Sequence, residues 1–211
     1  MVKLASKSPP AKPAAVPPIP ATSADGQPYS QLKATLRGIE PPIWRRMLVP
    51  SRLTLPNFHA ALQIAFGWDD SHLHAFRVGK ESYQAPDPDS FDSLGGNRDR
   101  DETAVRVGDL LTKKGAKLLY VYDFGDDWTV EVTLENILPD LPPMPVSCLA
   151  GARSGPPEDS GGIGGYEGLL AAIADPKHPE HEELREWLGE EFNPEEFDLK
   201  AINARLKKIK A

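Results

Sequence analysis

The alternation of apolar and polar residues predicts strands in the first third of the folded chain. Residues 29–39 alternate in this way and predict a half-buried strand, and residues 43–49 predict a second strand after a turn at Gly38 and two prolines. Apolar residues then recur at helical spacing from Leu55, behind a capping Thr54, which predicts a helix that stops at Gly67. Residues 73–78 predict a third strand.

The clearest pattern lies in residues 117–138 and predicts a hairpin. Residues 118–122 are apolar on both faces, as in a central strand, and residues 128–134 alternate cleanly, with turn-forming residues between the two segments. Residues 84–104 carry six acids and predict a long solvated loop. Residues 105–114 predict a strand edge and one helical turn, and residues 139–165 form a stretch rich in proline and glycine.

Three helices are expected to close the chain. Their residues are 166–174, 181–188 and 198–209, and the last helix has one apolar stripe among basic residues. Strands that come before helices predict an α+β fold. We therefore expect a mostly antiparallel sheet with one early helix and a C-terminal group of helices.

Proline and charge separate the N-terminal segment from the rest of the chain. Seven of the 22 prolines fall within residues 1–28, which carry a charge of +2. A Pro/Ala-rich segment of this kind cannot bury enough apolar surface to fold, so we expect a disordered tail at 1–28 and a single domain at 29–211. The whole chain has a net charge of -7, so the predicted domain carries -9.

Composition excludes several classes of partner. With a pI near 5.3, the chain is a poor ligand for double-stranded nucleic acid or an anionic membrane, both of which require a positive field. No apolar run approaches the roughly 20 residues of a membrane helix. One cysteine, Cys148, excludes an internal disulfide framework, is typical of a reducing compartment and leads us to expect a cytoplasmic protein. A protein or a small molecule remains as the expected kind of partner.

The first motif with chemical potential is the pair His72 and His74. If a strand begins at Leu73, both histidines project from the same face and can bind one metal ion or one anionic group. The alternative is that one histidine bonds a backbone carbonyl while the other faces solvent. A spacing of two residues does not separate these interpretations.

The second motif is the acidic tip of the predicted hairpin, where Asp123, Asp126 and Asp127 lie within five positions. These carboxylates can hold a hard cation, but the spacing favours turn residues that bond nearby backbone amides. Asp123 differs from the others because it ends an apolar strand. An unpaired carboxylate there is costly, so we expect Asp123 to have a definite partner.

The third motif is the glycine-rich segment 148–166. It lacks the lysine of a nucleotide-binding loop and no strand leads directly into it, so we reject a nucleotide site. Prolines followed by Glu158 and Asp159 instead predict a rigid loop whose backbone approaches another segment closely. Because Cys148 has no second cysteine, the tetrahedral zinc signatures are missing. Arg45 and Arg46 point to opposite faces of their strand, and we expect one of them to pair with an acid such as Asp123 or Glu158.

These motifs, in this order over about residues 29–205, resemble the plasmid pRiA4b ORF-3-like family. Many relatives have a second cysteine where this chain has Ser160. The resemblance implies an α+β domain of no established activity, found in a family associated with mobile elements, in which some relatives carry a resolvase-like label. A strongly acidic domain does not fit that label. The resemblance rests on Ile43-Trp44-Arg45-Arg46, Gly67-Trp68, His72-Leu73-His74, Tyr122 to Asp126 with Trp128, Cys148 to Gly151, Pro156 to Asp159, Gly161-Gly162, Gly165-Tyr166 and Phe197-Asp198.

Two hypotheses of function follow. The first is a non-enzymatic binding or interaction module with a shared polar site. The second is a metal-assisted hydrolase, in which a bound divalent ion lowers the pKa of water and a spare carboxylate acts as a base. The metal hypothesis requires the histidines and the Glu158–Asp159 carboxylates to lie within about 8 Å of one another. The candidate polar cluster is Arg45, His72, His74, Asp123, Asp126, Glu158 and Asp159, with His72, His74, Glu158 and Asp159 as candidate metal ligands.

Overall fold

The computed structural model describes residues 26–86, 100–189 and 192–210. The expected tail therefore lies almost wholly outside the described residues, as does much of the acidic loop expected at 84–104. The first strand begins at Gln27, so the ordered strand includes two residues that we assigned to the tail.

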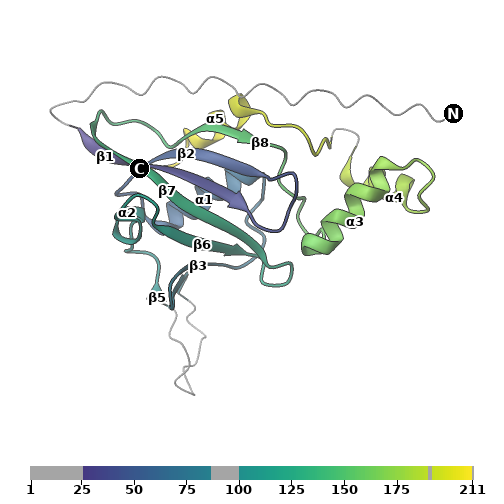
Figure 1. The fold of residues 1–211 in the computed structure, drawn as a ribbon, viewed down its shortest axis with the longest axis horizontal. Helices are drawn as coiled ribbons and strands as arrows, with labels where there is room; N and C mark the ends of the chain where they lie inside the picture. The colour runs from purple at the N-terminus through teal and green to yellow at the C-terminus, as the bar shows by residue number, and fades with distance from the viewer. Residues whose placement is uncertain (1–25, 87–99, 190–191, 211) are drawn as a thin grey trace, which may run out of the picture.

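An eight-stranded sheet forms the body of the molecule (Figure 1). The strand order is β5-β4-β3-β6-β7-β1-β2-β8, and every neighbouring pair is antiparallel except β4 and β5. This arrangement confirms the expected α+β class with a mostly antiparallel sheet. The strands are β1 (Gln27–Leu36), β2 (Trp44–Pro50), β3 (His74–Val78), β4 (Glu81–Gln84), β5 (Arg100–Asp101), β6 (Lys117–Tyr122), β7 (Trp128–Leu141) and β8 (Ser147–Ala152).

Five helices accompany the sheet within the described ranges, and one of them, α1, comes early in the chain as expected. It ends at Gly67, whose φ of 86° is the left-handed conformation that glycine adopts without strain. Figure 1 shows α3 and α4 side by side at one end of the molecule, beyond the strands. The helices are α1 (Leu55–Phe66), α2 (Val107–Leu110), α3 (Gly162–Ala174), α4 (His181–Leu188) and α5 (Leu199–Leu206). None of these described helices has the length and apolar character needed to cross a bilayer.

A bulge in β7 changes which sheet face its side chains cover. Gln31 of β1 lies opposite Asn136 and Leu32 lies opposite Leu134, so Glu135 is an extra residue in β7. As a result, Leu134 packs into the main core, while Leu138 packs against a second, smaller cluster with Tyr29 and Leu48. The strand β1 keeps the alternation seen in the sequence, because its residues from Leu32 onward alternate between buried and half-buried.

The strand β8 was not expected, because residues 139–165 read as a loop rich in proline and glycine. The segment pairs with β2 and places Cys148 in the core. Its outer edge is covered by α5, where the Asn203 amide accepts from Cys148 N at 2.8 Å and donates to Cys148 O at 2.9 Å. Burial raises the pKa of the Cys148 thiol to about 11, so the thiol stays protonated at neutral pH.

Arg45 and Arg46 differ from expectation, because neither pairs with Asp123 or Glu158. Arg46 pairs with Glu135 at 2.6 Å. Arg45 is 2% exposed and donates to four backbone carbonyls, those of Trp44, Ala65, Ala152 and Arg153. Arg45 thus fastens β2 to the end of α1 and to β8, and backbone carbonyls take the place that we expected a carboxylate to hold.

Candidate functional site

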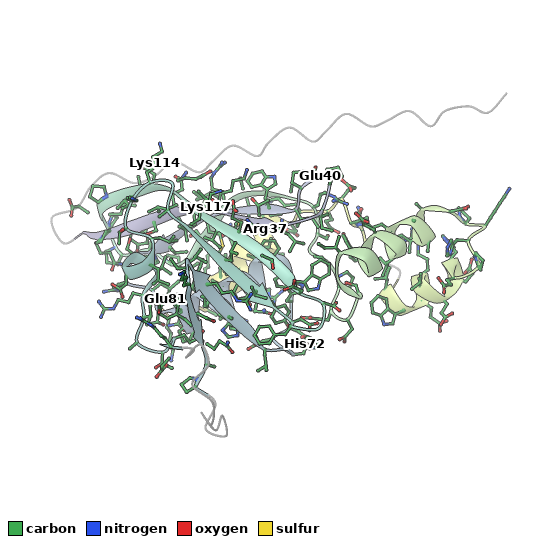
Figure 2. All side chains as sticks on the ribbon, turned by 60° about the horizontal axis from the view of Figure 1, so that its bottom comes forward. Arg37, Glu40, His72, Glu81, Lys114 and Lys117 are labelled. Atoms are coloured by element: carbon green, nitrogen blue, oxygen red, sulfur yellow. The ribbon has the colours of Figure 1, made fainter. Side chains whose placement is uncertain are left out.

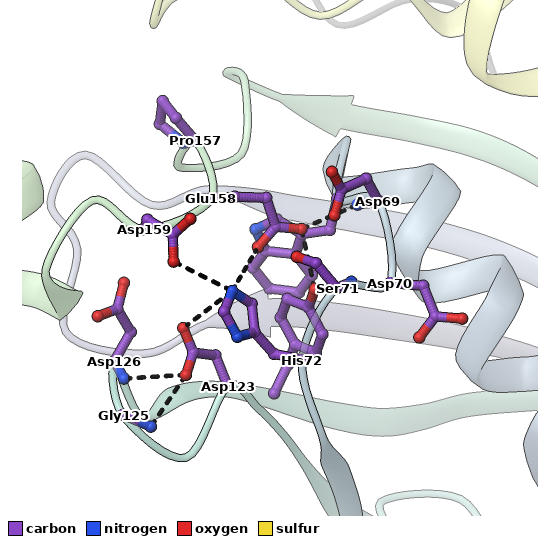
Figure 3. Close-up of polar contacts among 12 residues, drawn as sticks. Asp69, Asp70, Ser71, His72, Asp123, Gly125, Asp126, Pro157, Glu158 and Asp159 are labelled. Carbon is purple, nitrogen blue, oxygen red and sulfur yellow. Dashed lines mark hydrogen bonds and ion pairs between the residues drawn. The ribbon is translucent and has the colours of Figure 1, made fainter.

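Three separate connections meet at one end of the sheet. His72 precedes β3 and Asp123 follows β6, and these strands are antiparallel neighbours, so the two residues lie at the same end. A hydrogen bond of 3.0 Å from Asp123 N to Leu73 O extends the pairing beyond the strands. The loop between β8 and α3 brings Glu158 and Asp159 to the same place (Figure 3).

The imidazole of His72 faces three carboxylates. Its Nε2 atom lies 3.2 Å from Asp159 Oδ1, 3.7 Å from Asp123 Oδ2 and 4.0 Å from Glu158 Oε2. Both His72 Nε2 and Glu158 Oε2 are buried and have no hydrogen-bond partner among the described residues. Buried polar atoms are normally paired, so two such atoms side by side make this cluster a candidate binding site.

Asp123 is held in place by the turn that follows it. Its Oδ1 accepts from the backbone N–H groups of Gly125 at 2.9 Å and of Asp126 at 3.3 Å, which leaves Oδ2 to face His72. Its φ of 53° is left-handed, a conformation that aspartate tolerates better than most residues. The expectation that Asp123 has a definite partner is met by these two amides, which both bond to Oδ1.

Glu158 is oriented in a similar way by different groups. Its Oε1 accepts from Asp69 N at 2.8 Å and from the Tyr122 hydroxyl at 2.9 Å, so Oε2 is the oxygen left toward His72. Desolvation by burial raises the pKa of the Glu158 carboxyl above its usual range. Desolvation also raises the pKa of Tyr122 to about 12, which keeps its hydroxyl protonated as the donor.

Asp126 and the glycine-rich loop join the hairpin tip to α3. The Asp126 Oδ2 atom accepts from Gly161 N at 3.0 Å, and a Cβ placed on Gly162 would lie 2.6 Å from the Asp126 carbonyl oxygen. This is the close backbone approach that the sequence predicts for the loop. Asp126 therefore positions the loop that carries Asp159 and does not itself face His72.

His74 lies in a different cluster from His72, because β3 begins at His74 and His72 belongs to the preceding connection. The His74 Nε2 atom lies 3.1 Å from a carboxylate oxygen of the buried Glu102. Its ring stacks on that of His59, with centroids 3.6 Å apart and planes 7° from parallel. The structure therefore brings His72 to Asp123, Glu158 and Asp159, and places His74 elsewhere.

The second cluster is closed by internal hydrogen bonds. His59 Nε2 lies 2.7 Å from Asp70 Oδ1, and His59 Nδ1 lies 2.7 Å from the Tyr120 hydroxyl. Burial, with the neighbouring His74, lowers the pKa of His59. A metal ion lies near the plane of each imidazole that binds it, and parallel stacked rings have no common plane. This arrangement does not suit an ion shared by His59 and His74.

Sequence reasoning missed His59 and Glu102 as members of a polar cluster. His59 lies four residues after Leu55 on the buried face of α1, and a histidine among apolar core positions is the signal that could have identified it. Glu102 lies in an acidic stretch that resembles a solvated loop. Nothing in its local sequence distinguishes Glu102 from its exposed neighbours.

The cluster around His72 has the dimensions of a metal site. Two ligand atoms that are each about 2.1 Å from one ion lie roughly 3–4.2 Å apart, and the distances from His72 Nε2 fall in that range. One atom each of His72, Asp123 and Asp159 lies within 4.8 Å of the other two. Glu158 is outside that triplet although its Oε2 adjoins His72. Asp159 is 73% exposed, so solvent reaches the site from its side.

Comparisons with known proteins agree with the fold. The family model of the plasmid pRiA4b ORF-3-like protein matches residues 28–201. The chain is 35% identical over 174 residues to the uncharacterized protein y4hQ of Sinorhizobium fredii, an alignment that covers 82% of this chain and 85% of that protein. The crystal structure of MM3350, a protein of unknown function from Methanosarcina mazei Go1, is similar with a TM-score of 0.73 and 38% identity, covering 83% of this chain and 97% of that one. The chain therefore belongs to the plasmid pRiA4b ORF-3-like family.

Proposed function

We propose that the protein is a binding module for a divalent metal ion, held by His72 Nε2, Asp123 Oδ2 and Asp159 Oδ1. One observation carries the proposal: the buried Nε2 atom of His72 lacks a hydrogen-bond partner among the described residues and faces carboxylate oxygens from two other loops. A cation that accepts the imidazole lone pair and neutralises the carboxylates satisfies all of these groups together.

The donor set favours zinc or manganese. Imidazole nitrogen suits Zn²⁺, and carboxylate oxygen suits Mn²⁺ and the harder cations, so a mixed set of one nitrogen and several oxygens lies between these preferences. The exposed side of Asp159 leaves room for a water molecule or a ligand atom as a further donor. The ion thus has three protein ligands and an open position.

The proposal of a binding module rests on the positions of the three metal ligands in the fold. His72, Asp123 and Asp159 belong to three connections of the sheet, so an ion that binds them joins the start of β3, the end of β6 and the loop before α3. Binding to the folded state alone stabilises that state by about 2.7 kcal/mol when the free ion is at 100 times its dissociation constant. The ion would thereby fix the surface that these loops present to a partner.

The test is elemental analysis and calorimetric titration of protein purified without an affinity tag. We expect one equivalent of Zn²⁺ or Mn²⁺ per chain, a higher melting temperature with the ion, and affinity at least about 100-fold weaker in His72→Gln, since a principal ligand is lost. The matched control is His74→Gln, two residues away but outside the cluster. Equal losses in both variants, or no stoichiometric binding by the native protein, would contradict the proposal.

One observation favours a second function, metal-assisted hydrolysis. The Oε2 atom of Glu158 adjoins the proposed ion site but lies outside the triplet of ligands, and burial raises the pKa of this carboxyl. A carboxylate so placed can accept a proton from a metal-bound water. Turnover of bis(p-nitrophenyl) phosphate or p-nitrophenyl acetate by the zinc-loaded protein, abolished in Glu158→Gln with zinc still bound, would favour hydrolysis. Turnover no greater than that of free zinc would favour the module.

A further inference from the structure

A groove between α3 and α4 opens beside the proposed metal site. Its volume is about 500 Å³, within the range of about 300–1,000 Å³ of ligand-binding sites. Figure 2 shows the two helices projecting from the sheet, with side chains between them. The residues that matter to the argument are Asp159, Gly168, Leu169, Glu180, Glu183 and Trp187.

Two polar contacts join the helices that form the walls of the groove. His181 Nδ1 lies 2.9 Å from the Ala172 carbonyl oxygen, and Arg185 Nη2 donates to the Ile173 carbonyl oxygen at 3.4 Å. These contacts fix α4 against the last turn of α3. They also turn Arg185, the one lysine or arginine within α4, toward the end of α3.

The groove has apolar side chains in its lining and a glycine that leaves space free. Leu169 is buried, while Trp187 is 50% exposed, unusually open for a side chain of its size. A Cβ added to Gly168 would meet no atom within 4 Å, so the space above this position is empty. An extended aliphatic chain can lie in this space against the indole ring.

Three carboxylates and one histidine, His178, are the titratable side chains that line the groove, so acidic groups predominate. Glu180 and Glu183 line it, and neither makes an ion pair with any residue of the described ranges. Asp159 lies at the end shared with the His72 cluster. Unpaired carboxylates around an aromatic face attract an organic cation, because the ring adds a cation–π contribution to the charge–charge attraction.

We propose that this groove binds a basic segment of a partner protein. An arginine or lysine of that segment lays its aliphatic stem on Leu169 and Trp187 and directs its charged end to Glu180 and Glu183. Charge complementarity selects this occupant: the domain has a net charge of -9, and two free glutamates border the one half-exposed indole. This inference goes beyond metal binding and does not require the ion, because Glu180, Glu183 and Trp187 lie outside the His72 cluster.

The test is fluorescence anisotropy of labelled peptides added to the full-length protein. The probe is a fluorescein-labelled peptide of sequence GSRLRSG, with GSELESG as the opposite-charge peptide. Both are measured with EDTA, so that failure of the metal site does not affect the result. We expect saturable binding of GSRLRSG and no binding of GSELESG.

Charge variants separate the groove from general attraction by an acidic protein. The double variant Glu180→Gln/Glu183→Gln is expected to bind GSRLRSG about tenfold more weakly, which corresponds to about 1.4 kcal/mol. The control is Glu182→Gln/Glu186→Gln, which makes the same charge change on α4 at residues outside the groove lining. We expect this control to bind within about twofold of the native protein.

A second pair of variants tests the apolar lining. Gly168→Leu fills the empty space and is expected to weaken binding at least about tenfold while favouring the helix, since leucine is a better helix former than glycine. The control is Gly164→Leu on the same helix. A Cβ added at Gly164 also meets no atom within 4 Å, but this residue does not line the groove. Thermal denaturation of each variant checks that the fold is retained.

Several results would overturn the proposal. They are equal weakening by the groove and control variants, equal binding of the two peptides, and absence of saturable binding. A dimer of the native protein that is lost only in the groove variants would assign the groove to a second copy of the chain instead of a basic partner. Weaker peptide binding that is confined to Glu180→Gln/Glu183→Gln and Gly168→Leu supports the proposal of a basic partner segment.

Discussion

At the scale of single residues, the structure separates buried polar groups that are satisfied from those that are not. Arg45 carries a buried charge, yet four backbone carbonyls and the rings of Phe66 and Phe197 surround its guanidinium. Desolvation by burial lowers the pKa of Arg45 to about 10, so the side chain remains charged at neutral pH. In contrast, His72 Nε2 and Glu158 Oε2 are two of the five unpaired buried side-chain atoms within the described residues, and they adjoin each other.

Replacing Arg45 with methionine tests the first half of this distinction. Arg45→Met keeps much of the side-chain volume but leaves buried carbonyls without donors. We expect the free energy of unfolding in urea to fall by about 3 kcal/mol or more. The neighbouring Arg46→Met removes a partly exposed ion pair with Glu135 and a contact with the Trp44 ring, and it should cost about 1 kcal/mol or less. Similar costs for the two variants would show that the carbonyl contacts of Arg45 are not important for stability.

At the scale of elements, the sequence predicts those helices and strands that depend on residues close together in the chain. Helix α1 with its glycine stop, the β6–β7 hairpin and the helix at 181–188 follow from periodicity and turn residues, and all three are present. Strand β8 was missed because its apolar residues lie within a stretch rich in proline and glycine. Its status as a strand depends on pairing with β2, whose residues lie about 100 positions earlier in the chain.

The candidate site shows the same division between local and long-range information. Asp123 drew attention because a carboxylate at the end of an apolar strand requires a partner, and that argument needs only the local sequence. The separation of His72 from His74 could not be predicted, because it depends on the residue at which β3 begins and on Glu102 and His59 from distant segments. Because His72 lies before the first residue of β3, it does not follow the alternation of that strand and joins a different cluster from His74.

The connection between the hairpin tip and the glycine-rich loop gives a prediction at this scale. Asp126→Ala removes the acceptor for Gly161 N but leaves His72, Asp123 and Asp159 intact. We expect the dissociation constant for the metal to rise about tenfold, as for other groups that orient ligands, with a change in unfolding free energy below about 1 kcal/mol. Calorimetric titration measures the first quantity and urea denaturation the second. The same change at Asp127, whose side chain makes no hydrogen bond or ion pair to the loop in the described structure, is the control and should leave affinity unchanged.

At the scale of the whole molecule, the fold brings residues far apart in sequence to one end of the sheet. His72 and Asp159 are 87 positions apart, and the antiparallel pairing of β3 with β6 and the return of the chain after β8 place them 3.2 Å apart. The groove between α3 and α4 continues from the same loop. The acidic residues behind the net charge of -7 therefore have different roles. A few at this end face His72 and the groove, while others pair with surface cations.

The most direct measurement of the central claim is anomalous X-ray scattering from crystals grown with Zn²⁺ or Mn²⁺, with data collected on both sides of the metal absorption edge. We predict one strong peak per chain, about 2.0–2.3 Å from His72 Nε2 and within bonding distance of Asp123 Oδ2 and Asp159 Oδ1. A peak at the His59–His74 stack, or no peak at either cluster in crystals that contain the ion, would contradict the account.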